Sequence, residues 1–372
     1  SDVCSSDLAL DLIDCASARF KLRNEENGVV DHDEIVFEVA RIVGLPLDQI
    51  AAKESKNLKD LEKNMRAKVF GQERAIEALL DKVFIAQAGL KGLNKPVGSF
   101  LFVGPTGVGK TEAAKQLAAN MNVELVRFDM SEFQEKHSVA KFIGSPPGYV
   151  GFEDNAGQLI TKLQEHPNCI LLLDEVEKAH PDVLTILLQL MDNGFVTGSN
   201  GKKADARNAI LIMTSNIGAA DAERNAVGFG SLERSGDNKG AINRFFAPEF
   251  RNRLDGIIKF DKLEHETMVK IVKKFVEELN SLTKDRNIFV RPTAEAINFL
   301  VEKGFDKKMG ARPLQKTIDE NIKKPLSKEI LFGKLTNGGI VEVSVKNGEL
   351  LLNFLDILSI KKLETTENVT EN

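Results

Sequence analysis

The sequence predicts an α/β fold in which a five-stranded, mainly parallel sheet is followed by a smaller α/β domain. Five apolar runs of strand length lie between residues 67 and 260, and segments with helical periodicity separate them. Strands that alternate with helices are typical of a parallel sheet covered on both faces. The five runs are residues 99–103, 124–128, 169–173, 209–214 and 256–260.

After Phe260 the pattern changes, which predicts a second domain over residues 261–354. Apolar residues recur at helical spacing from Met268 to Leu279. Asn347-Gly348 stands between two apolar runs and is a strong signal for a β-hairpin. The remaining elements expected here are helices near 293–303 and 312–331, a short strand at 288–290, and hairpin strands at 340–345 and 350–354.

The two ends of the chain carry weaker patterns. Residues 1–8 resemble a translated sequencing adapter, so we expect an artefact there and exclude them from the fold prediction. Residues 9–23 have a helical pattern, and charged helical segments follow as far as residue 63. The polar residues 355–372 are expected to form a disordered tail.

Composition narrows the class of protein. The 372 residues are 42% hydrophobic, which is enough for two or three domains with real cores. The net charge is −5 with acids and bases interspersed, so nucleic acid is not the expected partner. Cys4, Cys15 and Cys169 have no metal-ligand spacing, and Cys169 lies in an apolar run. Without an apolar run of eighteen residues or a secretion signal, we expect no membrane contact and a cytoplasmic, reducing location.

A glycine-rich segment follows the first apolar run and precedes a helical pattern. Such a turn closes backbone N–H groups around phosphate oxygens, and the helix N-terminus adds a favourable field. Lys110 is expected to reach the β- and γ-phosphates, and the Thr111 hydroxyl to bind Mg²⁺. The alternative is a plain flexible turn, which the complete motif and its strand and helix context disfavour. The eight residues are Gly104, Pro105, Thr106, Gly107, Val108, Gly109, Lys110 and Thr111.

About seventy residues later, the buried run at 169–173 ends in two acids. Asp174 is suited to the Mg²⁺ shell, and Glu175 to orienting and deprotonating an attacking water. Alone, an apolar run before two acids is more often a strand that enters solvent. Together with the glycine-rich segment, it predicts a protein that binds and hydrolyses a nucleoside triphosphate.

Six further motifs stand in order along the chain, at residues 69–72, 129–133, 144–151, 174–180, 250–255 and 309–313. With these motifs, residues 9–354 resemble the C-terminal AAA+ module of Clp-type protein unfoldases and are most similar to the ClpA group. The resemblance implies a P-loop AAA+ large domain at 67–260, an AAA+ small domain at 261–354, and ATP with Mg²⁺. It also implies a homo-hexamer, and a remnant of a preceding AAA+ module at 9–66, for which a stand-alone N-terminal domain is the alternative.

The resemblance also implies roles at the ATP site. Asn216 is the expected polar sensor of the γ-phosphate, and Arg312 the second sensor, carried by the small domain. Arg253 is the expected arginine finger, which one subunit inserts into its neighbour's site; Arg251 lies close by. Val69 and Phe70 are expected to line the adenine. The alternatives are a turn residue for Asn216, a surface arginine for Arg253 and helix packing for Val69 and Phe70.

Three loops are implied to contact proteins. Tyr149, the single tyrosine, is expected to grip substrate in the ring pore together with Gly148, Val150 and Gly151; the alternative is an ordinary aromatic in a turn. A second pore loop is expected at 198–203. Val227, Gly228 and Phe229 resemble the tripeptide that docks such ATPases on the ClpP peptidase, with a local packing anchor as the alternative. Phe229 departs from the ClpA pattern, which leaves ClpA-like and ClpC-like assignments open.

The implied function is an ATP-dependent unfoldase and translocase that threads unfolded or tagged proteins, with a possible adaptor, into ClpP. A ClpB-like disaggregase that acts without a peptidase is the alternative. A regulatory module with little ATP turnover and a DNA remodeller are further alternatives, and the acidic balance disfavours the last.

Overall fold

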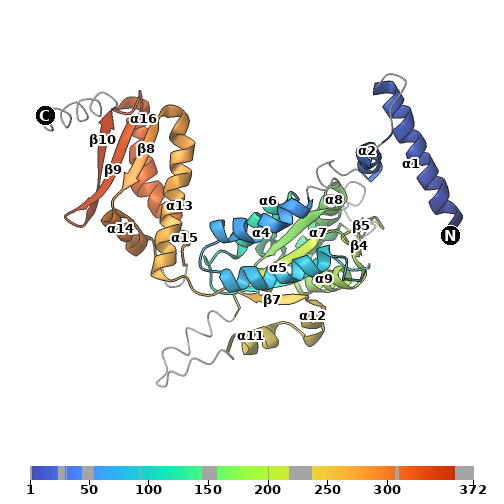
Figure 1. Cartoon of the computed structure of the whole chain (residues 1–372). Coiled ribbons are helices and arrows are strands. Elements are labelled where there is room, and N and C mark those ends of the chain that lie inside the picture. The colour runs from blue at the N-terminus through green and yellow to red at the C-terminus, as the bar shows by residue number, and fades with distance from the viewer. Residues whose placement is uncertain are drawn as a thin grey trace.

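A computed structural model describes residues 2–23, 30, 32–43, 54–92, 94–144, 157–199, 201–217, 237–305 and 310–356 (Figure 1). Its larger sheet has the order β2-β3-β6-β1-β7, and every neighbouring pair is parallel. Each strand falls within two residues of a predicted run, so the α/β prediction is confirmed. The strands are β1 (Gly98–Val103), β2 (Glu124–Asp129), β3 (Cys169–Asp174), β6 (Ile210–Ser215) and β7 (Gly256–Lys259).

The three central strands β1, β3 and β6 are buried at every position because helices cover both faces of the sheet. Successive side chains point to opposite faces, so Phe100 and Phe102 join one core while Leu101 and Val103 join the other. The first core includes α4 (Glu54–Lys68), α5 (Glu73–Gln87) and α6 (Lys110–Met121); the second includes α7 (Lys136–Ile143), α8 (Gln158–Glu165), α9 (Pro181–Asn193), η1 (Met130–Phe133), α11 (Asp237–Phe245) and α12 (Pro248–Arg253).

The smaller sheet has the order β10-β9-β8, with β8 (Ile288–Pro292) parallel to β9 (Gly339–Lys346) and β10 (Glu349–Asp356) antiparallel to it. Asn347 and Gly348 have φ angles of 53° and 76°, as a two-residue hairpin turn with positive φ at both positions requires. The predicted hairpin is therefore confirmed. A third core packs this sheet against α13 (His265–Thr283), α14 (Ala294–Gly304), α15 (Arg312–Ile318) and α16 (Lys324–Phe332).

The single helix predicted near 312–331 is interrupted. Between α15 and α16 the chain forms a π-helical turn, η4 (Asp319–Lys323). Pro325 lies in the first turn of α16, where its missing N–H removes one helical hydrogen bond and its ring crowds the preceding turn. The wider turn accommodates this proline without ending the helical path.

At the N-terminus, α1 (Asp2–Arg23) packs against α2 (His32–Val43). Arg19 on α1 forms ion pairs with Glu34 and Glu38 and lies over the ring of Phe37. The helix predicted from residue 9 thus begins seven residues earlier. In the part of the chain that the structure describes, no helix is long and apolar enough to cross a membrane.

Candidate functional site

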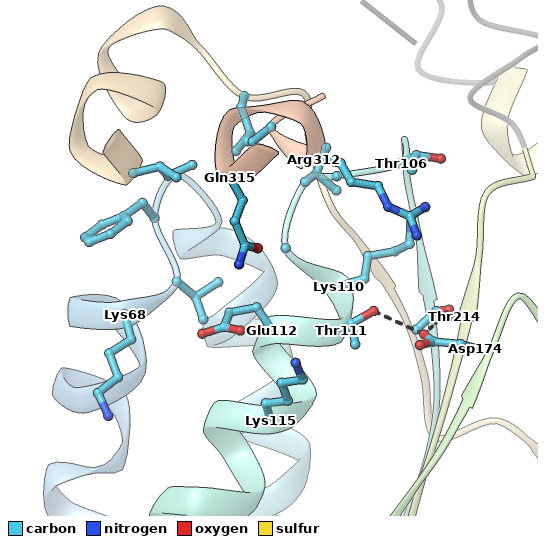
Figure 2. Close-up of a pocket in the computed structure, with 18 of the residues that line it drawn as sticks. Lys68, Thr106, Lys110, Thr111, Glu112, Lys115, Asp174, Thr214, Arg312 and Gln315 are labelled. Carbon is cyan, nitrogen blue, oxygen red and sulfur yellow. Dashed lines mark hydrogen bonds between the residues drawn. The ribbon is translucent and has the colours of Figure 1, made fainter. Parts of the chain in front are cut away.

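A cavity of about 660 Å³ lies between the carboxyl edge of the larger sheet and the helices α13 and α15 (Figure 2). It gathers residues that are far apart in the sequence, from both sheet-containing parts of the chain. Predicted site residues that line it are Val69, Phe70, Thr106, Gly107, Val108, Gly109, Lys110, Thr111, Asp174, Glu175, Asn216 and Arg312.

The glycine-rich segment connects β1 to α6, as predicted. Gly107 and Gly109 have φ angles of 74° and 105°, which residues with a Cβ rarely adopt, and a Cβ on Gly104 would lie 2.4 Å from the carbonyl oxygen of Phe260. Gly109 caps α6 without a side chain, so no side-chain oxygen occupies the first N–H groups of that helix. This end of α6 can therefore accept phosphate oxygens.

Lys110 is the buried cation of the cavity. Its Nζ donates hydrogen bonds to the carbonyl oxygens of Gly104 and Pro105 at 2.6 and 2.7 Å, and to Oδ1 of Asn216 at 2.8 Å. Burial lowers the pKa of Lys110 to about 8. Gly104 and Pro105 thus hold this lysine instead of lining the cavity, and an incoming phosphate would compete with three neutral acceptors.

Asp174, at the end of β3, has partners on both oxygens. Oδ1 accepts from the hydroxyls of Thr111 at 3.1 Å and Thr214 at 2.9 Å, and Oδ2 accepts from Nε of Arg127 at 2.8 Å. A carboxylate beside a threonine hydroxyl, at the phosphate-binding end of a helix, fits Mg²⁺, which takes few protein oxygens and completes its shell with phosphate and water.

Glu175 adopts a left-handed backbone conformation, with φ 57° and ψ 50°. Its N–H donates to the Thr214 hydroxyl at 3.1 Å, and its Oε1 lies 3.4 Å from Nδ2 of Asn216. Its Oε2 forms an ion pair with Nζ of Lys178, in η2 (Val176–Lys178), at 2.5 Å. Glu177 accepts the backbone N–H of Asn216 at 3.0 Å. Asn216 therefore links Lys110 to the two glutamates.

The opposite wall of the cavity is apolar, and residues before the larger sheet and residues after it both contribute to it. Val69 and Phe70 follow α4, while Leu263, Ile271 and Phe275 come from the second half of the chain. Such a wall suits the flat face of a purine base.

Hydrogen bonds from Lys274 and Ala311 join the two sides of the cavity. Lys274 on α13 donates to the carbonyl of Lys68 at 3.1 Å and to Oε1 of Glu112 at 3.2 Å. Ala311 donates its N–H to the carbonyl of Gly107 at 3.3 Å, directly before Arg312. Figure 2 shows Arg312 and Gln315 extending from this segment into the cavity.

Arg253 does not join this cavity. At the end of α12, its Nε donates to Oδ1 of Asp192 at 2.8 Å, and a second carboxylate, Glu249, lies 3.8 Å away. The hydrogen bond to Asp192 raises the pKa of Arg253. Arg251 contacts Asn243 and the carbonyl of Phe246 and likewise lies outside the cavity.

The predicted protein-contact loops are mostly outside the described residues. This holds for Gly148, Tyr149, Val150 and Gly151, and for Val227, Gly228 and Phe229. Residues 198–203 join β4 (Phe195–Thr197) to β5 (Lys203–Asp205), and Asn200 is not described. Ser199 donates to the carbonyl of Ile143 at 3.1 Å, so this hairpin tip lies beside the end of α7.

Sequence reasoning missed several residues of the cavity. Arg127 and Thr214 hold Asp174, Lys178 pairs with Glu175, and Lys274 joins the two walls. A polar residue at the end of a buried strand was a usable signal for Thr214. Lys274 is one of several lysines on an exposed-looking helix and carried no such signal.

Two family models match the chain. Residues 95–257 match the AAA domain (Cdc48 subfamily), and residues 263–343 match the C-terminal, D2-small domain of ClpB protein. A ClpA homolog protein from Fuscovulum blasticum is 52% identical over 93% of this chain, and ClpC/MecB, a negative regulator of genetic competence from Bacillus subtilis, is 41% identical over 89%. This chain spans 44% and 42% of those two proteins, less than half of their length.

Solved structures agree with these matches. A closed-state reconstruction of Hsp104 with ATPγS and FITC-casein has a TM-score of 0.79 and 37% identity, over 94% of this chain and 60% of that one. The S. cerevisiae Hsp104:casein complex in its extended conformation also has a TM-score of 0.79, with 36% identity over 94% of this chain and 61% of that one. With both family models adjacent and in order, and with relatives of this kind along nearly its whole length, the chain belongs to the Clp/Hsp100 family of AAA+ proteins.

Proposed function

We propose that this chain is the ATP-hydrolysing module of a protein unfoldase. The observation that carries the proposal is the single cavity in which Lys110, Thr111, Asp174, Glu175 and Arg312 meet. A triphosphate along the glycine-rich segment would lie between the N-terminus of α6 and the Lys110 ammonium. Mg²⁺ held by Thr111 and Asp174 would neutralise charge on the β- and γ-phosphates.

Glu175 is the base in this proposal. Its carboxylate lies beside Asn216, which also contacts Lys110, so water bound between them would face the γ-phosphate. The carboxylate accepts a proton from that water while the water oxygen attacks the γ-phosphorus, and ADP leaves. Asn216 orients the water and senses whether the γ-phosphate is present.

Arg253 would act on the site of a neighbouring copy. Its guanidinium lies outside its own cavity and pairs with Asp192, so it needs a second subunit to reach a triphosphate. An arginine supplied in trans stabilises charge on the transferred phosphoryl group by about 10³-fold or more. A homo-oligomeric ring, which we take to be a hexamer, would supply this second subunit.

Hydrolysis would become motion through the smaller domain, residues 261–354. Arg312 lies one residue after Ala311, which bonds to the Gly107 carbonyl of the phosphate-binding segment. Loss of the γ-phosphate would release Arg312 and change the angle between the two walls of the cavity. The domain limits 67–260 and 261–354 are part of this proposal.

The work performed is proposed to be the threading of protein substrates into ClpP. Casein appears with Hsp104 in the similar structures, and a protein substrate for this chain is inferred from that likeness. Tyr149 in the pore and Val227, Gly228 and Phe229 in docking keep their expected roles. A ClpB-like disaggregase remains the second candidate, because the chaperone protein ClpB of Bacillus anthracis is 42% identical over 87% of this chain. The cytoplasmic location stays a prediction.

ATP hydrolysis by the chain tests the ATPase proposal. We expect phosphate release that Glu175→Gln abolishes while nucleotide binding is kept. Equal, low release by both proteins would support a site that only gates assembly.

Degradation of a tagged, stable protein with ClpP tests the partner. Deleting residues 227–229 should abolish degradation and preserve ATP hydrolysis, whereas deletion without effect would favour the disaggregase. Tyr149→Ala should stop unfolding with hydrolysis retained, and unchanged degradation would exclude the pore-grip role.

A further inference from the structure

Arg127 neutralises the carboxylate that is proposed to hold the metal. It projects from β2, an edge strand of the larger sheet, toward the end of the neighbouring β3. Its Nε and Nη2 lie 2.8 and 2.7 Å from the same oxygen, Oδ2 of Asp174. Two donors of one guanidinium thus share one carboxylate oxygen, which is a strong, charge-assisted arrangement.

The other oxygen of Asp174 is also in use. Oδ1 accepts from Thr111 and Thr214, so the carboxylate has no oxygen without a partner in the described protein. Asp174 is only 7% exposed, and a buried carboxylate without a compensating partner is costly. Arg127 therefore supplies the positive charge that this position needs when no metal is bound.

A metal ion beside Thr111 and Arg127 on the other oxygen of Asp174 would compete for the charge of the same carboxylate. Mg²⁺ demands near-ideal octahedral geometry and carries two positive charges, which would repel a guanidinium bonded to the same carboxylate. Thr111 is the second proposed ligand of the metal, and Thr214 is buried on the strand beside β3. Arg127 is the partner that can leave, because its side chain is 49% exposed and also borders a second groove along β2.

We propose that Arg127 is a positioning residue that takes the place of the metal's charge at Asp174 and yields that carboxylate when Mg²⁺ arrives with nucleotide. This inference rests on the proposed function. The Arg127–Asp174 ion pair would have two effects. Nucleotide without metal meets a neutralised Asp174 and is not repelled, and Mg²⁺ must displace an internal cation before it binds.

The test is a Mg²⁺ titration of nucleotide binding. Fluorescent mant-ADP, excited directly, serves as the probe, because the chain contains no tryptophan to report binding by itself. The proteins are wild type, Arg127→Gln, Arg127→Lys, and the control Arg286→Gln, an exposed arginine of η3 (Lys284–Arg286) that lines none of the cavities described above.

For Arg127→Gln we expect metal-free mant-ADP to bind about three- to tenfold more weakly, and the Mg²⁺ concentration at half-saturation to fall by a similar factor. These factors correspond to the free energy of an ion pair between an exposed and a buried side chain. Arg127→Lys should lie between, since it keeps the charge and loses the fork. Arg286→Gln should match wild type. An unchanged or raised Mg²⁺ midpoint in Arg127→Gln overturns the proposal.

A nucleotide-free readout separates this inference from the proposed function. In EDTA, Arg127→Gln should lower the melting temperature in the wild-type background and leave it unchanged in the Asp174→Asn background, because the partner charge is gone. Equal shifts in both backgrounds overturn the role of Arg127. If this coupling appears but no protein binds mant-ADP at any Mg²⁺ concentration, the ATPase proposal and the metal-displacement step both fail.

Discussion

Glu175 and Lys178 form an ion pair, with 2.5 Å between Oε2 of the glutamate and Nζ of the lysine. The left-handed backbone at Glu175 starts the turn of η2, which brings the two side chains together three residues apart. The pair raises the pKa of Lys178, chiefly through the hydrogen bond to Glu175. The proposed base is therefore held by a cation in the nucleotide-free protein.

Replacing Lys178 with glutamine should raise ATP hydrolysis. The ion pair holds the Glu175 carboxylate on Lys178, so freeing it to bind the attacking water should increase kcat by about two- to tenfold, as expected for an ion pair at a surface-accessible position. The measurement is kcat for phosphate release at saturating ATP.

The matched control is Lys162→Gln on α8. Lys162 pairs with Glu165 at 2.7 Å, also three residues apart, and its side chain is 49% exposed against 47% for Lys178. This variant should leave kcat unchanged. A fall in kcat for Lys178→Gln as deep as that of Glu175→Gln would mean that Lys178 builds the active arrangement instead of restraining it.

Gly310→Ala should weaken the packing of residues 310–312 on the phosphate-binding segment. Gly310 has a φ of 60°, and a Cβ there would lie 2.5 Å from the carbonyl oxygen of Thr106. Strain and overpacking together should cost about 3 kcal/mol and weaken nucleotide binding. Gly89→Ala is the control, since its φ is 72° and its Cβ would meet nothing within 4 Å.

Thermal unfolding and mant-ADP affinity measure the two effects. Gly89→Ala should cost about 1 kcal/mol from the backbone alone and leave nucleotide affinity intact. If both alanine variants behaved alike, close packing of Gly310 on the phosphate-binding segment would have no energetic weight.

Lys274→Met should loosen the contact between α13 and the larger sheet. The substitution removes the hydrogen bonds to Lys68 and Glu112 and keeps the aliphatic stem. Loss of about 1 kcal/mol would speed local opening about fivefold. Limited proteolysis within residues 260–264, which connect β7 to α13, should accelerate by that factor, and nucleotide should suppress the difference.

Lys273→Met is the control for that experiment. Lys273 is an exposed neighbour on the same helix, and no ion pair of it is found among the described residues. Its cleavage rate should equal that of wild type. Equal acceleration by both variants would show that helix composition, and not the Lys274 contacts, controls the opening.

Cys169 should be inert in the folded protein. Burial raises its pKa from 9.0 to about 12, so its thiol stays protonated at pH 8, whereas Cys15 is exposed. In a Cys4→Ser, Cys15→Ser variant, Ellman's reagent should react only after denaturation. The folded-state pKa is the higher one, so the stabilisation from this group is complete below pH 9 and is lost between pH 9 and 12. Prompt labelling at pH 8 without denaturant would contradict this burial.

The sequence itself determined the strands, the hairpin and the phosphate-binding segment, because these depend on local patterns. Apolar runs at 99–103 and 169–173 became β1 and β3, and Asn347-Gly348 became the hairpin turn with positive φ at both residues. Glycines at 107 and 109 supply the angles that the turn before α6 needs. Each of these features follows from a few neighbouring residues and the conformations open to them.

Only the tertiary structure decided which charges face one another. Arg127 and Asp174 are 47 residues apart, and Lys274 and Glu112 are 162 apart. Pairing of β2 with β3 fixes the first contact, and packing of α13 beside α4 and α6 fixes the second. A charged side chain looks the same in a sequence whether it points to solvent or to a distant carboxylate, because its partner is selected by the register of strands and the packing of helices.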